Sequence, residues 1–278
     1  MRISLIQMNS ASDKAANLAQ ARGLVEEAVR LDRPDWVCLP EVFDFLGGSR
    51  AEKMAAAEEI PGGPAYALCQ GLARAHGIFI HAGSILERIA GEDRLHNTTV
   101  VFDRAGEEVA RYRKIHMFDI TAPNGEAYRE SATFKPGAAV ATYECEGVTV
   151  GCAICYDIRF PQLFQELMDR GAQMIALPAA FTLQTGKDHW EVLCRARAIE
   201  TESYFVAAAQ CGTHVAGNEP RQTYGHSLVA DPWGHVVAKA SDGPGHVSAR
   251  IDPALVTRVR AMIPVAAHRV ALRSGGQA

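Results

Sequence analysis

V-T-V-G-C-A-I-C-Y-D-I-R-F, residues 148–160, has the pattern of a buried strand that runs directly into a turn. Apolar, β-forming residues lead up to Cys155, polar residues follow it, and Pro161 then opens a helical pattern of apolar residues. A strand that ends on a cysteine and turns at once into a helix exposes that side chain at the edge of a sheet, and the helix N-terminus favours the thiolate. This pattern makes Cys155 a candidate nucleophile, although an isolated cysteine can equally be a small buried apolar residue.

The rest of the chain extends this strand-and-helix pattern. Apolar spacing predicts strands at 3–8, 36–39, 78–86, 96–102, 107–112, 173–177, 204–210, 227–230, 236–240 and 246–251. It predicts helices at 13–31, 65–76 and 188–202, besides the one after Pro161. Strands alternate with helices early and cluster as hairpins late, which indicates an α/β fold of mixed sheets with helices outside. Because no repeat or linker interrupts the pattern, we expect one domain over 1–270 and a loosely held tail at 271–278.

Length and composition argue against several classes of protein. The chain has 278 residues, a hydrophobic share of 48%, a charged share of 22% and a net charge of −4. These values are ordinary for a soluble globular protein and give no reason to expect a nucleic-acid or membrane partner. No stretch approaches the roughly eighteen uninterrupted apolar residues of a membrane-spanning helix. Polar residues also interrupt the N-terminal M-R-I-S-L-I-Q-M-N-S before a signal-peptide core could form.

The cysteines indicate a reducing environment. There are seven, an odd number without paired spacing, so they do not form a disulfide framework, and we expect a cytoplasmic protein. Cys152 and Cys155 make a C-x-x-C, but no second C-x-x-C or H-x-x-x-H follows, which argues against a zinc site.

Three residues at strand ends or loop starts make a workable set for cleaving an amide: Glu41, Lys114 and Cys155. A thiol needs a base, and a carboxylate in a dry pocket can have the required pKa. The tetrahedral intermediate carries an oxyanion, which a fixed cation and a backbone N–H stabilise, and Lys114 and the N–H of Tyr156 can supply these. Residues 115–136 lack clear periodicity, and a loop so long within a compact domain is usually functional.

Three motifs resemble the catalytic motifs of the nitrilase superfamily of carbon–nitrogen hydrolases. They are P-E at 40–41, Y-R-K-I-H-M-F-D at 112–119 and C-Y-D-I-R-F-P at 155–161, and they occur in the order of that family. The resemblance extends from the first strand to about residue 269. It implies a four-layer α-β-β-α sandwich that is paired into homodimers or higher homo-oligomers.

The same resemblance implies a role for each catalytic residue. Cys155 is the nucleophile, Glu41 the general base and Lys114 the partner of the oxyanion. A second glutamate stands sixteen residues after the lysine in this branch of the family, which is Glu130 and not Glu126. No metal or organic cofactor has a role in this scheme.

Later stretches bear on the branch within the superfamily. Residues 185–202, 207–212 and 224–227 resemble the branch that hydrolyses deaminated glutathione, whereas 122–128 departs from it. The expected activity is hydrolysis of the terminal amide of a small carboxylated substrate to the acid and ammonia, through a cysteine thioester. The alternatives are an ω-amidase acting on α-ketoglutaramate-like acids, an N-carbamoyl hydrolase, and a catalytically silent scaffold protein.

Three further residues are candidates for substrate binding. Arg159, four residues after Cys155, can hold a substrate carboxylate or can form a structural ion pair with Asp157. Phe181 and Thr185 are candidate walls of the pocket. A Cys–His dyad with His116 or His189 is less favoured than the glutamate base, because one histidine follows Lys114 in a loop and the other begins a helix.

Overall fold

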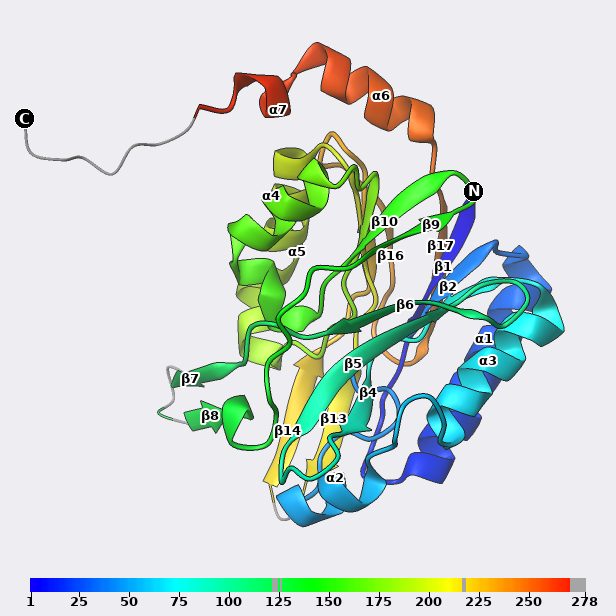
Figure 1. Ribbon diagram of the computed structural model, residues 1–278, viewed down its shortest axis with the longest axis vertical. Coiled ribbons are helices and arrows are strands. Elements are labelled where there is room, and N and C mark those ends of the chain that lie inside the picture. The colour runs from blue at the N-terminus through cyan, green and yellow to red at the C-terminus, as the bar shows by residue number, and fades with distance from the viewer. Residues whose placement is uncertain (122–124, 126, 217–218, 271–278) are drawn as a thin grey trace, which may run out of the picture.

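Two β-sheets face each other at the centre of the molecule, and helices cover the outer face of each (Figure 1). The structure is a computed structural model that describes residues 1–121, 125, 127–216 and 219–270. The layers run helix, sheet, sheet, helix, as the resemblance to the nitrilase superfamily implies. This α-β-β-α sandwich brings residues from distant motifs to one end of the sheets.

The first sheet has the strand order β17-β1-β2-β3-β5-β4, and β6 pairs with β5. Its strands are β1 (Arg2–Gln7), β2 (Trp36–Cys38), β3 (Phe79–His81), β4 (Ile85–Arg88), β5 (Leu95–Phe102), β6 (Glu108–Arg113) and β17 (Gly245–Arg250). β1, β2 and β3 are parallel, and the helices α1 (Lys14–Asp32) and α3 (Pro64–His76) connect them. Asp13 caps α1 by accepting a 3.0 Å hydrogen bond from the N–H of Ala16.

The second sheet has the order β16-β15-β12-β11-β10-β9. Its strands are β9 (Thr142–Cys145), β10 (Val148–Cys152), β11 (Met174–Ala176), β12 (Tyr204–Ala207), β15 (Leu228–Ala230) and β16 (Val236–Lys239). β10, β11 and β12 are parallel, and α4 (Pro161–Asp169) and α5 (Leu183–Thr201) connect them on the outer face. Carboxyl ends of parallel strands therefore meet at one edge of this sheet, where the Cys155 turn begins.

Side-chain alternation along the central strands fills two layers of core. Leu5, Trp36 and Cys38 pack with residues of the second sheet, whereas Ile6 and Val37 pack with residues of α1 and α3. Successive side chains of a strand point to opposite faces, so both faces of these strands must be apolar. Burial of both faces therefore explains why these strands are continuous apolar runs in the sequence and do not alternate with polar residues.

Smaller elements surround the end of the sheets that holds the catalytic motifs. They are α2 (Arg50–Ala56), β7 (Asp119–Thr121), β8 (Ala127–Arg129), the 3₁₀ helices Glu130–Ala132 and Cys155–Arg159, and the hairpin of β13 (Cys211–Ala216) and β14 (Glu219–Tyr224). After β17 come α6 (Pro253–Met262) and α7 (Val265–His268), at the top of Figure 1. Among the described residues, no helix is both long enough and apolar enough to cross a membrane.

Some of the observed elements differ from the expected ones, and the strand expected at 204–210 ends at Ala207. Residues 78–86 form two strands and not one, because Gly83 turns the chain with a φ of +48° so close to Pro40 that a Cβ would lie 2.0 Å from its carbonyl oxygen. α5 begins five residues before the expected position, at Leu183, with Thr182 as its N-cap. The hairpin of β13 and β14 was not expected from the pattern, and the predicted tail at 271–278 lies outside the described residues.

Candidate active site

The residues of the three motifs line one cavity of about 520 Å³. Glu41, Lys114, Glu130 and Cys155 all contribute to its wall, although they come from four different parts of the chain. Among the other predicted site residues, Tyr156, Phe181 and Thr185 also line this cavity. Such a volume is typical of pockets that enclose a small organic molecule.

Cys155 occupies a strained backbone position at the base of this cavity. β10 ends at Cys152, three residues earlier than the sequence suggests, and Cys155 opens a 3₁₀ helix with a φ of +46°. Its N–H donates to the carbonyl of Pro178 (2.8 Å), which fixes the turn to the end of β11. Positive φ is uncommon for a residue with a Cβ and is typical of nucleophile positions on sharp strand-to-helix turns.

The surroundings of the Cys155 sulfur oppose its ionisation, and they outweigh the help that a helix N-terminus gives to a thiolate. Burial raises the pKa of the Cys155 thiol well above its usual range, and the carboxylate of Glu41 adds to this effect. The ammonium of Lys114 and the N–H of Ala180 oppose it without reversing it. A short 3₁₀ helix, and not a longer α-helix, follows the cysteine. The thiol is neutral at rest and needs a base to become a nucleophile.

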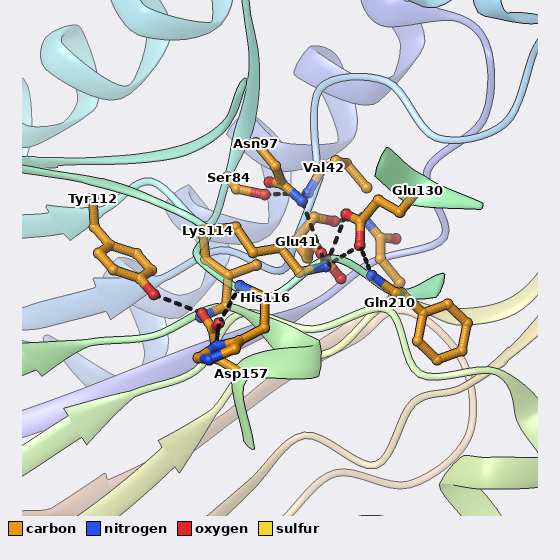
Figure 2. Close-up of polar contacts among 12 residues, drawn as sticks. Glu41, Val42, Ser84, Asn97, Tyr112, Lys114, His116, Glu130, Asp157 and Gln210 are labelled. Carbon is orange, nitrogen blue, oxygen red and sulfur yellow. Dashed lines mark hydrogen bonds and ion pairs between the residues drawn. The ribbon is translucent and has the colours of Figure 1, made fainter. Parts of the chain in front are cut away.

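Lys114 lies between two carboxylates (Figure 2). Its Nζ is 3.0 Å from Oε1 of Glu41 and 2.9 Å from each oxygen of Glu130. Burial alone favours the neutral amine, but Glu130 and Glu41 outweigh it and raise the pKa of Lys114 well above its usual range. The lysine is therefore a fixed cation beside the sulfur. Glu126, the other candidate, lies outside the described residues.

Glu41 is positioned by polar side chains whose roles the sequence does not reveal. Asn97 of β5 donates a 2.9 Å hydrogen bond to Oε1 of Glu41, and Gln210 donates a 3.0 Å bond to its backbone oxygen. The next residue, Val42, has a φ of +44°, and its N–H donates to Ser84 (2.8 Å). The only sequence signal for Asn97 is a polar residue in an otherwise buried strand, which does not identify its partner.

Asp157 joins the Cys155 turn to the loop after Lys114, as Figure 2 shows. Its carboxylate accepts hydrogen bonds from the hydroxyl of Tyr112 (2.7 Å), the N–H of Ile154 (2.9 Å) and the N–H of His116 (3.0 Å). The imidazole Nδ1 of His116 lies 2.7 Å from the same carboxylate. These contacts make His116 a partner of Asp157 and not of the sulfur.

Arg159 does not form an ion pair with Asp157, which was one of the two roles that the sequence left open for it. The carboxylate of Asp157 points into the protein toward Tyr112, whereas Arg159 extends along the outside of the turn. Its Nη2 donates to Nδ1 of His189 (3.2 Å), and its guanidinium lies 5.6 Å from the ring centroid of Phe181. Arg159 is absent from the described residues that line the cavity and lies one side chain behind that wall.

Comparison with known proteins gives the family. The sequence profile of the carbon–nitrogen hydrolase family matches residues 2–261. The chain belongs to this family. It is 41% identical over 276 residues to the deaminated glutathione amidase of Mus musculus, which covers 96% of this chain and 82% of that protein.

Two solved structures place this carbon–nitrogen hydrolase in the nitrilase superfamily. The NitFhit protein of Caenorhabditis elegans superposes with a TM-score of 0.89 at 38% identity, over 96% of this chain and 64% of that one. Nit3 of Saccharomyces cerevisiae, a member of branch 10 of the nitrilase superfamily, superposes with a TM-score of 0.85 at 30% identity, over 95% and 94% of the two chains. The chain is a hydrolase of carbon–nitrogen bonds other than peptide bonds.

The site of this hydrolase holds the groups that amide cleavage needs. A neutral thiol, a carboxylate within reach of it and a buried ammonium converge on one cavity. Among the described residues, no cluster of three or more His, Cys, Asp or Glu side chains could hold a metal ion. The chemistry available to the chain's own side chains is acyl transfer by a cysteine.

Proposed function

We propose that this amidase cleaves the γ-glutamyl amide of deaminated glutathione, with Cys155 as nucleophile, Glu41 as general base and Lys114 as the oxyanion partner. The observation that carries the proposal is Lys114 clamped between Glu41 and Glu130 beside a neutral thiol. The substrate class rests on the 41% identity to enzymes named for that substrate.

Acylation begins with proton transfer. Glu41 takes the thiol proton of Cys155, and the sulfur attacks the amide carbon. Lys114 and the N–H of Tyr156 stabilise the oxyanion that forms. Glu41 then returns the proton to the departing nitrogen, the carbon–nitrogen bond breaks, and a thioester to Cys155 remains.

Deacylation uses the same groups in reverse. Glu41 removes a proton from water, the resulting hydroxide attacks the thioester carbon, and the sulfur of Cys155 leaves and regains its proton. Glu130 holds Lys114 in place through both steps by bonding its Nζ with both oxygens. Asn97, through its bond to Oε1, orients Glu41.

The identity of the leaving group follows from the substrate. Glutathione is a γ-glutamyl tripeptide, so its deaminated form presents a secondary amide whose nitrogen belongs to a dipeptide. Cleavage of that amide releases a dipeptide amine, whereas a simple terminal amide would release ammonia. The cavity of about 520 Å³ is large enough for a molecule of tripeptide size.

Phe181 and Thr185 form part of the cavity wall that faces the acyl group in this proposal. Phe181 is packed against Trp190 with ring centroids 5.0 Å apart, so its position is rigid. Arg159 stands behind Phe181 and Tyr156, where its charge supports binding of a carboxylate on the acyl side.

The oligomeric state and the cellular compartment of the protein are also proposals. Val192 and Ile199 on α5 are 67% and 50% exposed and lie on one side of the helix, with Trp233 46% exposed as well. Apolar side chains so exposed favour a homodimer that uses α5. All seven cysteines are free thiols, which suits a reducing cytoplasm.

The test compares three substrates: deaminated glutathione, α-ketoglutaramate and an N-carbamoyl amino acid. We expect kcat/KM for deaminated glutathione to exceed the other two by at least about tenfold, with the dipeptide amine detected by mass spectrometry. A preference for α-ketoglutaramate would make the protein an ω-amidase, and a preference for the carbamoyl compound a carbamoyl hydrolase. No turnover of any of them would favour a scaffold.

A further inference from the structure

We propose that the hydroxyl of Thr223 determines specificity by accepting a hydrogen bond from a peptide N–H in the leaving-group half of the substrate. This inference rests on the proposed function, because that function gives the substrate a leaving dipeptide with a peptide bond of its own. It goes further by naming the side chain that distinguishes such a substrate from a small terminal amide. Thr223 lies on β14, and Thr223 and His214 of β13 both line the cavity that holds Cys155.

The imidazole of His214 has a defined direction of hydrogen bonding. Its Nδ1 lies 2.7 Å from the carbonyl oxygen of Ser10. A carbonyl oxygen can only accept, so Nδ1 carries the proton. Burial lowers the pKa of His214, and the hydrogen bond to Ser10 opposes this without reversing it, so the imidazole is neutral near pH 7. In a neutral imidazole with its proton on Nδ1, Nε2 is an acceptor.

The hydroxyl of Thr223 takes its direction from this imidazole. Its Oγ1 lies 2.6 Å from Nε2 of His214. Lone pairs on both atoms would repel at this distance, so the O–H of Thr223 points at Nε2 and donates to it. In the part of the chain that the structure describes, no other group hydrogen-bonds to this oxygen. A hydroxyl has only one hydrogen, so toward the cavity Oγ1 of Thr223 is an acceptor only.

A network of buried hydrogen bonds fixes this acceptor relative to the catalytic base. Ser10, whose carbonyl holds His214, also accepts a 2.8 Å bond from Nε2 of Gln210 at its hydroxyl. The same Nε2 of Gln210 donates to the backbone oxygen of Glu41 (3.0 Å). The side chains that form the acceptor are themselves enclosed, since His214 is 2% and Thr223 8% exposed. The acceptor is therefore held in place before a substrate binds.

Other polar groups of the cavity wall do not have this restriction. The hydroxyls of Thr182 and Thr185 lie 2.8 Å apart, and either can be the donor. Gln222 is exposed, and its amide offers both a donor and an acceptor. Oδ1 of Asn97 has no hydrogen-bond partner, but it is enclosed by protein atoms. Thr223 differs from these groups because it selects for a donor.

The half of the proposed substrate that offers such a donor is the leaving dipeptide. The acyl half carries carbonyl and carboxylate oxygens, which only accept hydrogen bonds. The nitrogen of the scissile amide faces Glu41, which returns a proton to it in the proposed mechanism. The next N–H belongs to the peptide bond of the dipeptide. A small terminal amide that releases ammonia has no such N–H, so a contact to Thr223 favours the peptide-like substrate.

The experiment compares deaminated glutathione with an analogue in which an ester replaces the peptide bond of the leaving dipeptide. The exchange removes one N–H and keeps the scissile amide and the charges. In wild type we expect kcat/KM for the peptide to exceed that for the ester by about three- to tenfold, which is the effect of one neutral hydrogen bond on binding. Thr223→Val keeps the shape of the side chain without its hydroxyl, and the ratio should fall by about this factor.

Two further variants control for packing. Thr223→Ser keeps the hydroxyl and should keep most of the wild-type ratio. Thr213→Val is the matched control, since Thr213 lies on the same hairpin, is exposed and is absent from the described residues that line the cavity. A wild-type ratio in Thr223→Val would overturn the proposal, even if activity on both compounds fell. So would an equal fall of the ratio in Thr223→Ser or Thr213→Val, which would assign the effect to packing of the hairpin.

Calorimetry in the Cys155→Ala background separates this inference from the proposed function. Suppose the peptide binds more tightly than the ester, Thr223→Val removes that preference, and wild type hydrolyses neither compound. The proposed substrate would then be refuted and the acceptor kept. Hydrolysis of the peptide by wild type, with a ratio that Thr223→Val does not change, would keep the amidase and refute the acceptor. Absence of both binding and hydrolysis would refute both.

Discussion

The hydroxyl of Tyr112 donates a 2.7 Å hydrogen bond to Oδ2 of Asp157, and this bond joins the strand before Lys114 to the turn that carries Cys155. Both groups are buried, and Asp157 is fully enclosed. Burial raises the pKa of the Tyr112 phenol well above its usual range and the carboxylate of Asp157 raises it further, so the phenol keeps its proton and remains a donor. This contact fixes the Cys155 turn relative to the strand that leads to Lys114.

Tyr112→Phe should lower the free energy of unfolding by about 1.5–3 kcal/mol, the value of a buried hydrogen bond to a charged group. It should also lower kcat more than it raises KM, because the Cys155 turn loses a support. Urea unfolding and steady-state kinetics measure the two effects. Tyr66→Phe is the control, since it removes a tyrosine–glutamate bond of 3.0 Å remote from the cavity. Equal loss of kcat in both variants would contradict a positioning role for Tyr112.

Cys155→Ala should abolish hydrolysis and leave folding intact, because this side chain supplies reactivity more than packing. With a slow substrate, intact-mass analysis of wild type should show an acyl adduct that peptide mapping places on Cys155. Cys69→Ala, which removes a buried thiol from α3, should still form the adduct. Full activity in Cys155→Ala would disprove the nucleophile assignment.

Glu130→Gln should lower kcat about tenfold or more and change substrate affinity little. The substitution removes one of the two carboxylates that raise the pKa of Lys114, so the ammonium loses support in a buried site. Glu126→Gln should have little effect. Steady-state kinetics on both variants measure kcat and KM. A larger loss of kcat in Glu126→Gln than in Glu130→Gln would show that the wrong glutamate has been assigned.

Arg159→Met should reduce the preference for carboxylated amides over a neutral amide such as butyramide by up to about fivefold in kcat/KM, because the guanidinium lies behind the cavity wall and acts on the carboxylate through its charge and not through a direct hydrogen bond. The reason is the loss of a cation beside the walls formed by Tyr156 and Phe181. A melting curve should accompany the kinetics. Equal losses on both substrates with a lowered Tm would mean that Arg159 only supports the wall.

Asp44→Asn should stabilise the protein above pH 6 and have no effect near pH 4. Burial raises the pKa of Asp44 from 3.8 to about 6; Lys14, 3.1 Å away, opposes this and Glu58 adds to it. The folded state therefore binds this proton more tightly than the unfolded state, so the free energy of unfolding falls as pH rises from about 4 to 6.

The full difference between Asp44→Asn and wild type should be about 3 kcal/mol at pH 7, from the size of this pKa shift. Urea unfolding at pH 4, 5, 6 and 7 measures it. A constant difference across this range, or a destabilised variant at pH 7, would contradict the assignment of the raised pKa to Asp44.

Local pattern was sufficient for most of the fold. Asp13 marks the start of α1, and the alternation of strands with helices indicates mixed sheets with helices outside, whereas the four-layer order was implied by the resemblance to the nitrilase superfamily. The pattern did not reveal the break at Gly83, because what forces it is the backbone of Pro40, a neighbour in space and distant in sequence. β13 (C-G-T-H-V-A) and β14 (E-P-R-Q-T-Y) form a hairpin that contributes residues to the cavity wall, and neither strand has the apolar alternation by which a half-buried strand is recognised.

The sequence by itself determined which residues are candidates for catalysis. Glu41, Lys114 and Cys155 lie in three motifs that occur in the order of the family, and residue types and order are sufficient to identify these motifs. Only the tertiary structure decided how they meet and in which protonation state. The clamp on Lys114 depends on side-chain distances, and the neutral thiol of Cys155 depends on burial beside a carboxylate. Distances and local dielectric arise from contacts between segments far apart in the chain, and no local pattern of residue types contains them.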